Sequence, residues 1–148
     1  MADADVLPQD YQIYAEDIRS YLERGRARAA DRGVKLDFAA AMAAAQSFVA
    51  AGAAMHQMQL APPKNAAALN RALASTERAL LLPDGLPRRP WYRHSIYAPG
   101  EYTGYAAVVI PGVNEGIEAG GATRAQEQLD LLAQALERAA AALNSATK

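Results

Sequence analysis

Apolar residues spaced by three or four constrain this chain more than any other feature, because that period places them on one face of an α-helix. The pattern recurs in four segments, at residues 8–30, 37–60, 65–82 and 123–145. The positions on these faces are Tyr11, Tyr14, Ile18, Tyr21 and Leu22; Phe38, Met42, Ala45, Val49, Gly52 and Met55; Leu69, Leu73, Thr76 and Leu80; and Leu129, Leu132, Leu136 and Leu143. The sequence therefore predicts four helices.

Capping and turn residues mark the ends of these helices. Gly33 is a plausible stop for the first helix, and Asp37 is a good N-cap for the second. Pro83 begins the turn that ends the third. Thr123, with Gln126 three residues later, has the spacing of a capping box at the start of the fourth. The links between the first three helices are short, which predicts antiparallel neighbours.

The helical pattern stops between Pro83 and Ala122, where most of the prolines lie. A connection of that length tends to be functional. Residues 106–110, AAVVI, predict a short extended piece, and residues 112–119, GVNEGIEA, predict one or two helical turns. We therefore expect an all-α fold, a four-helix bundle with a long proline- and tyrosine-rich loop between helices three and four.

Size and charge narrow the possible functions. The chain has 148 residues, and we expect residues 1–148 to form one domain. Its formal net charge of -1 gives no global attraction to nucleic acid or to an anionic membrane. No apolar run is long enough for a spanning helix. We expect neither nucleic-acid binding nor direct membrane contact. The chain has no cysteine, which excludes disulfides and thiolate chemistry.

The residues do not predict a self-contained active site. The two histidines, His56 and His94, lack the spacings of zinc and di-iron sites. We therefore expect no metal ligand and no cofactor in this chain. Ser95 follows His94 directly, but a catalytic triad is made by spatial geometry rather than by adjacency. We assign no catalytic residue.

The tyrosines of the long loop allow two interpretations. A phenol on a tight loop can donate a hydrogen bond to an anionic ligand, or its ring can hold the loop in place by burying area. Under the first interpretation the chain is a stand-alone helical small-ligand-binding protein or enzyme built around His94, Tyr97, Tyr102 and Tyr105. Under the second interpretation the tyrosines are packing residues.

The same loop carries a long and specific motif. Residues 78–112 read RALLLPDGLPRRPWYRHSIYAPGEYTGYAAVVIPG, with the run GLP-x-RP-aromatic-YRH-x-IYAP at 85–99 and PG at 111–112. This stretch resembles the C-terminal dimerisation domain of the transferrin receptor and glutamate carboxypeptidase II family. The resemblance implies a helical domain that follows a zinc peptidase domain and pairs with a second copy to make a homodimer. Two zinc ions and the catalytic glutamate belong to the peptidase domain in that family.

The resemblance also implies roles for the loop. In the family, the loop at 83–112 packs on the peptidase domain and closes one side of its substrate pocket. Tyr105 matches a tyrosine that binds a substrate carboxylate, and Gly104 stands where the family has a lysine, so glutamate specificity is not assigned. The parent is expected to be an exported amino- or carboxypeptidase, periplasmic or extracellular, that acts on peptides. The residues expected to pack on its peptidase domain are Arg93, His94, Tyr97 and Pro99.

Two expectations follow for the chain by itself. It should be inactive, because the peptidase domain is absent. Four loop residues should also lack packing partners for the same reason, and these are Trp91, Tyr92, Ile96 and Tyr97.

Overall fold

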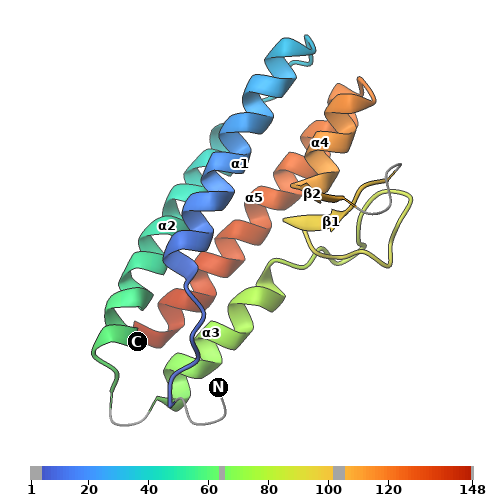
Figure 1. The fold of residues 1–148 in the computed structure, drawn as a ribbon. Coiled ribbons are helices and arrows are strands. Elements are labelled where there is room, and N and C mark those ends of the chain that lie inside the picture. Colours follow the sequence, from blue (N-terminus) through green and yellow to red (C-terminus); the bar gives the residue numbers. More distant parts are fainter. Residues whose placement is uncertain (1–4, 64–65, 102–105, 148) are drawn as a thin grey trace.

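The computed structural model describes residues 5–63, 66–101 and 106–147. Within these ranges the chain has five α-helices, which are α1 (Tyr11–Asp31), α2 (Ala39–Leu60), α3 (Ala67–Ala79), α4 (Pro111–Glu118) and α5 (Ala122–Asn144). A 3-10 turn, η1 (Ser145–Thr147), follows α5, and the strands β1 (Tyr97–Pro99) and β2 (Ala107–Val109) form a small antiparallel sheet beside the helices (Figure 1). The fold is therefore mostly helical, with a two-stranded sheet.

The four predicted helices correspond to α1, α2, α3 and α5. The predicted extended piece contains β2, and the predicted helical turns are α4, so both predictions are confirmed. The expectation of an all-α fold is right about the mostly helical character and misses the sheet. In the sheet, Tyr97 pairs with Val109 and Pro99 pairs with Ala107. Pairing of this kind joins two separate segments, so the periodicity within either segment does not predict it.

Helix α5 holds the fold together, because it packs against α2, α3 and α4, while α1 packs against α2 and α4 (Figure 1). The core between them contains fully buried large side chains such as Ile18, Phe48 and Leu73. Alanine and glycine fill the closest crossings. A Cβ added at Gly52 of α2 would lie 2.5 Å from the carbonyl oxygen of Tyr11 in α1, so these two helices approach closely.

The predicted caps are only partly right. Asp37 does not occupy the N-cap position of α2, which is Phe38, although an Asp37 carboxylate oxygen accepts a hydrogen bond from the Ala39 N–H at 2.9 Å. The capping box at the start of α5 is wrong, because the N-cap there is Gly121 without a side-chain bond. The Gln126 amide instead binds the main chain of Asp37, accepting from its N–H at 2.8 Å and donating to its carbonyl at 3.1 Å.

Helix α3 ends at Ala79, three residues before the predicted end. The Leu80 carbonyl accepts hydrogen bonds from the backbone N–H and the hydroxyl of Ser95, so the chain leaves the helix to pair with the loop. In the part of the chain that the structure describes, no helix is both long and apolar enough to cross a bilayer.

Candidate functional site

The long loop is held on the domain by main-chain pairing. The Ser95 N–H donates to the Leu80 carbonyl at 3.2 Å, and the Leu82 N–H donates to the Arg93 carbonyl at 2.7 Å. Ile96 is fully buried in the main core, and its carbonyl accepts from the Ile110 N–H at 2.8 Å. The loop therefore returns along its own start before it enters the hairpin.

The hairpin brings the middle of the loop next to α4. Ala98 pairs with Val108 across the two strands, and the Gly100 N–H donates to the Ala106 carbonyl at 3.1 Å. Residues 102–105 follow directly. The candidate substrate-binding residues Gly104 and Tyr105, and Tyr102 of the alternative site, lie outside the described residues, so their roles stay predictions.

A buried ion pair ties the loop and the hairpin to α4. Arg89 donates from Nη2 to both carboxylate oxygens of Glu115 at 2.7 Å, and both side chains are only 9% exposed. Arg89 also donates to the Pro99 carbonyl, and Glu115 accepts from the Glu101 N–H at 3.0 Å. A charge-assisted pair in a desolvated place constrains geometry strongly. This pair therefore fixes where the hairpin leaves the domain.

Sequence reasoning did not find this pair. Arg89 and Glu115 are 26 positions apart and belong to a loop and to a short helix. No helical or strand spacing relates them. Arg89 is part of the loop motif, but the motif alone names no acidic partner.

Aromatic rings from α1 meet the hairpin at β1. Tyr97 stacks against Tyr14 with ring centres 6.1 Å apart, and against His94 at the same separation. The Tyr21 and Tyr97 hydroxyls lie 2.9 Å apart and share one hydrogen bond. Burial raises the pKa of Tyr14 and of Tyr97 above the usual range of a phenol. These rings are therefore neutral at ordinary pH and pack as uncharged aromatic groups.

The polar atoms of His94 are all used within the domain. Its Nδ1 accepts from the Ile96 N–H at 3.2 Å and from the Tyr97 N–H at 3.4 Å. Because Nδ1 is an acceptor, a neutral ring carries its proton on Nε2, which lies 3.0 Å from a Glu77 carboxylate oxygen. Across residues 5–63, 66–101 and 106–147, no three histidine, aspartate or glutamate side chains come together as a metal site would require. The contacts of His94 in the structure are thus made within its own domain.

The four residues expected to pack on another domain have contacts inside this one. Arg93 donates from Nε to the Leu82 carbonyl at 3.1 Å, and the Pro99 carbonyl accepts from Arg89. His94 and Tyr97 form the aromatic stack. Their packing on a peptidase domain stays a prediction.

The expectation that four loop residues lack packing partners is wrong for Ile96 and for Tyr97, whose ring stacks against Tyr14 and His94. Trp91 is 70% exposed, whereas Ile96 is completely buried against the helices of its own chain. Tyr92 and Tyr97 are each 37% exposed. Ile96 directly precedes β1, and it belongs to the main hydrophobic core of the helices.

A cavity of about 470 Å³ lies between α1, the hairpin and α4. The carboxylates that line this cavity form ion pairs with arginine side chains. Glu101 binds Arg88 at 2.8 Å, and Glu118 binds Arg28 at 3.1 Å. The lining residues are Arg28, Gly100, Glu101, Val108, Asn114, Glu115, Glu118 and Ala119. We assign this cavity no ligand.

Comparison with known proteins gives consistent matches. The model of a family described as transferrin receptor-like dimerisation domain matches residues 34–144. A protein of Arthroderma benhamiae named "Probable glutamate carboxypeptidase" is 33% identical over 152 residues, covering 98% of this chain and 21% of that protein. "Probable glutamate carboxypeptidase LAMP1" of Arabidopsis thaliana is 28% identical over 118 residues, covering 80% of this chain and 17% of that protein. The chain thus spans about a fifth of the length of these relatives.

Proposed function

Because the chain belongs to the transferrin receptor-like dimerisation domain family, we propose that it is the homodimerisation domain of a glutamate carboxypeptidase-like zinc metallopeptidase. The family match over residues 34–144 is the observation that carries this proposal. The named relatives add support, since both are called glutamate carboxypeptidases and both are about five times as long as this chain. Catalytic groups and the two zinc ions belong, in this proposal, to the rest of the parent protein.

The second part of the proposal concerns the loop at 83–112. It packs on the peptidase domain and forms one side of the substrate pocket. The rigid attachment of the hairpin through Arg89 and Glu115 supports this role, because a pocket wall has to be held in place to contribute to binding. Tyr105 is the proposed hydrogen-bond donor to a substrate carboxylate. Because Gly104 offers no charge, the proposed substrate is a peptide, and no glutamate specificity is assigned to it.

Sedimentation equilibrium across a wide concentration range tests the pairing. We expect the 148-residue chain to form a dimer, because its family is described as a dimerisation domain. A chain that remains monomeric at the highest concentration would contradict pairing through these residues alone.

Peptide cleavage tests the enzymatic part. The parent protein should cleave peptides and lose that activity when a chelator removes its zinc, while the 148-residue chain should show none. Cleavage by the chain alone, lost in the Tyr97→Phe variant, would favour the stand-alone site instead.

A further inference from the structure

Residues 85–93, called the loop tip below, are closed by their own hydrogen bonds. The Leu86 N–H donates to the Tyr92 carbonyl at 2.8 Å. The Arg89 N–H donates to the Leu86 carbonyl at 3.0 Å, and the Tyr92 N–H donates to the Arg89 carbonyl at 2.9 Å. Three bonds within nine residues leave this segment little freedom, so its side chains are presented in a defined arrangement.

Gly85 makes this closure possible. Its φ of +71° lies in the left-handed region that favours glycine. A Cβ at this position would also lie 2.2 Å from the Pro90 carbonyl oxygen. The two sides of the loop tip therefore touch at their backbones, which keeps the tip narrow.

One side of the loop tip points inward. Leu86 is 2% exposed and packs with Leu82 and Ala98 in a small core of its own. Arg89 reaches Glu115, as described above, and its guanidinium lies 5.6 Å from the ring centre of Tyr92. These inward contacts hold the base of the tip on the domain, so the opposite side is left to face outward.

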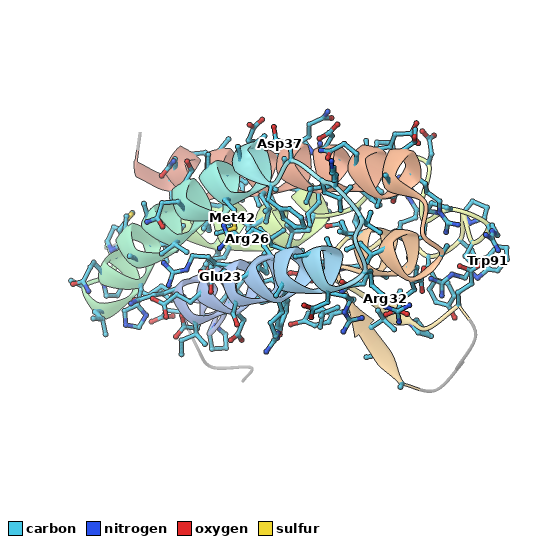
Figure 2. All side chains as sticks on the ribbon, turned by 90° about the horizontal axis from the view of Figure 1, so that it is seen from above. Glu23, Arg26, Arg32, Asp37, Met42 and Trp91 are labelled. Atoms are coloured by element: carbon cyan, nitrogen blue, oxygen red, sulfur yellow. The ribbon has the colours of Figure 1, made fainter. Side chains whose placement is uncertain are left out.

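The outward side carries Trp91. Its indole is 70% exposed, the largest exposed fraction among the large apolar side chains of the described residues. It contacts Tyr92 with ring centres 6.3 Å apart, and it lies at the edge of the molecule, away from the helices (Figure 2). Exposed tryptophans are often hot spots of protein interfaces, where the indole fills a pocket of the partner. A side chain on a loop that is already ordered loses little conformational entropy when it binds.

We propose that Trp91 is the anchor through which the loop tip docks into an apolar pocket of the parent's peptidase domain. This inference rests on the proposed function and names the contact residue of that interface. Trp91 is expected from the sequence to lose its partners without that domain, and it stays exposed. The residues assigned there, Arg93, His94, Tyr97 and Pro99, already have partners within this domain.

Tethering favours the parent's own domain over a second copy. One buried tryptophan covers about 150–250 Å², and a stable interface between separate molecules needs about 1,200–2,000 Å². A contact made by this narrow tip alone is therefore too small to be the dimer interface of the proposed function. A covalently linked domain requires far less area, because linkage raises its effective concentration. The relatives, of which this chain spans about a fifth, contain such additional chain.

Fluorine NMR with 5-fluorotryptophan tests the anchor. Trp91 is the sole tryptophan of the 148-residue chain, so that chain gives one fluorine resonance. In the full parent, the resonance of Trp91 is the one that disappears from the spectrum of the Trp91→Phe variant. The shift between H₂O and D₂O reports exposure of the indole. We expect a large isotope shift in the chain alone and its near-complete loss in the parent. Unchanged circular dichroism of Trp91→Phe shows that the variant is folded.

Other outcomes overturn the inference in distinguishable ways. A parent that is dimeric and cleaves peptides while Trp91 keeps its isotope shift leaves the proposed function standing and refutes the anchor. Loss of the shift in the chain alone at rising concentration assigns the site to a second copy. If the isotope shift of Trp91 is lost only when phosphatidylcholine–phosphatidylglycerol vesicles are added, Trp91 binds a membrane surface instead. A parent that neither pairs nor cleaves refutes the proposed function, whatever the resonance shows.

Discussion

Arg89 and Glu115 meet through a single guanidinium nitrogen, with both carboxylate oxygens of Glu115 lying 2.7 Å from Arg89 Nη2. The pair connects three parts of the chain, because Arg89 also binds the Pro99 carbonyl and Glu115 also binds the Glu101 N–H. The loop tip, the hairpin and α4 are therefore held in one arrangement by two side chains.

Glu115→Gln should destabilise the domain strongly. The amide keeps the size of the side chain and leaves the Arg89 guanidinium buried without its counter-charge, which costs about 3–5 kcal/mol in buried pairs. Glu118→Gln is the matched control, because its pairs with Arg28 and Arg32 are about half exposed and such pairs are worth at most about 1 kcal/mol. Urea unfolding measures both, and equal losses would refute the special role of the buried pair.

Tyr14→Phe should leave the free energy of unfolding unchanged or raise it. The Tyr14 hydroxyl is buried and has no hydrogen-bond partner among the described residues, and removing a buried unpaired group removes its desolvation cost. Tyr11→Phe is the comparison, because the Tyr11 hydroxyl donates to the Leu73 carbonyl at 2.9 Å. We expect that variant to lose about 1 kcal/mol. Thermal and urea unfolding rank the two, and the reverse order would contradict this assignment.

Stability should fall in alkali as the buried phenols ionise. Burial raises the pKa of Tyr11 to about 12 and raises those of Tyr14 and Tyr97 as well. Above about pH 10 the unfolded chain binds fewer protons than the folded one, so the free energy of unfolding decreases as pH rises through the folded values. Below that pH this contribution is fully present.

The Tyr14→Phe variant isolates one of these groups. Its free energy of unfolding should fall less steeply than that of the wild type between about pH 10 and 12, because one raised pKa is removed. Urea unfolding at a series of alkaline pH values gives both slopes. Parallel curves would show that Tyr14 ionises in the folded state as readily as in the unfolded chain.

Gly52→Ala should destabilise the crossing of α1 and α2. A methyl group at this position meets the Tyr11 carbonyl at 2.5 Å, and overpacking of this kind costs about 1–3 kcal/mol. Ala54→Gly, on the exposed side of the same helix, is the control. It changes the same pair of residue types without a packing contact, and it should lower the free energy of unfolding by about 1 kcal/mol through helix propensity alone. A gain in stability from Gly52→Ala would mean that the helices move apart without penalty.

The sequence predicts the helices well because their burial is local and periodic. The spacing predicts the buried faces of α1 and α5, and Ile18, Leu22, Leu129 and Leu136 are buried as expected. The helix ends were less predictable, because their side chains had a choice of partners. Gln126 has capping-box spacing but binds Asp37, 89 positions away.

The candidate site was predictable as a region and not in its contacts. The motif located the loop, and Trp91 was expected to be exposed. The Arg89–Glu115 pair depends on how the hairpin lies against α4, and the burial of Ile96 depends on how the loop packs onto the helical core. Such contacts arise only once distant segments are assembled. The proposed roles of Gly104 and Tyr105 rest on the resemblance alone.

The central place of α5 has a consequence for how the protein is made. Helices α2, α3 and α4 all precede α5 in the chain, and each packs against it. During translation the faces of these helices that pack against α5 stay uncovered until α5 has left the ribosome. Exposed apolar surface of this kind favours aggregation. The nascent chain is therefore expected to need a chaperone until its last long helix arrives.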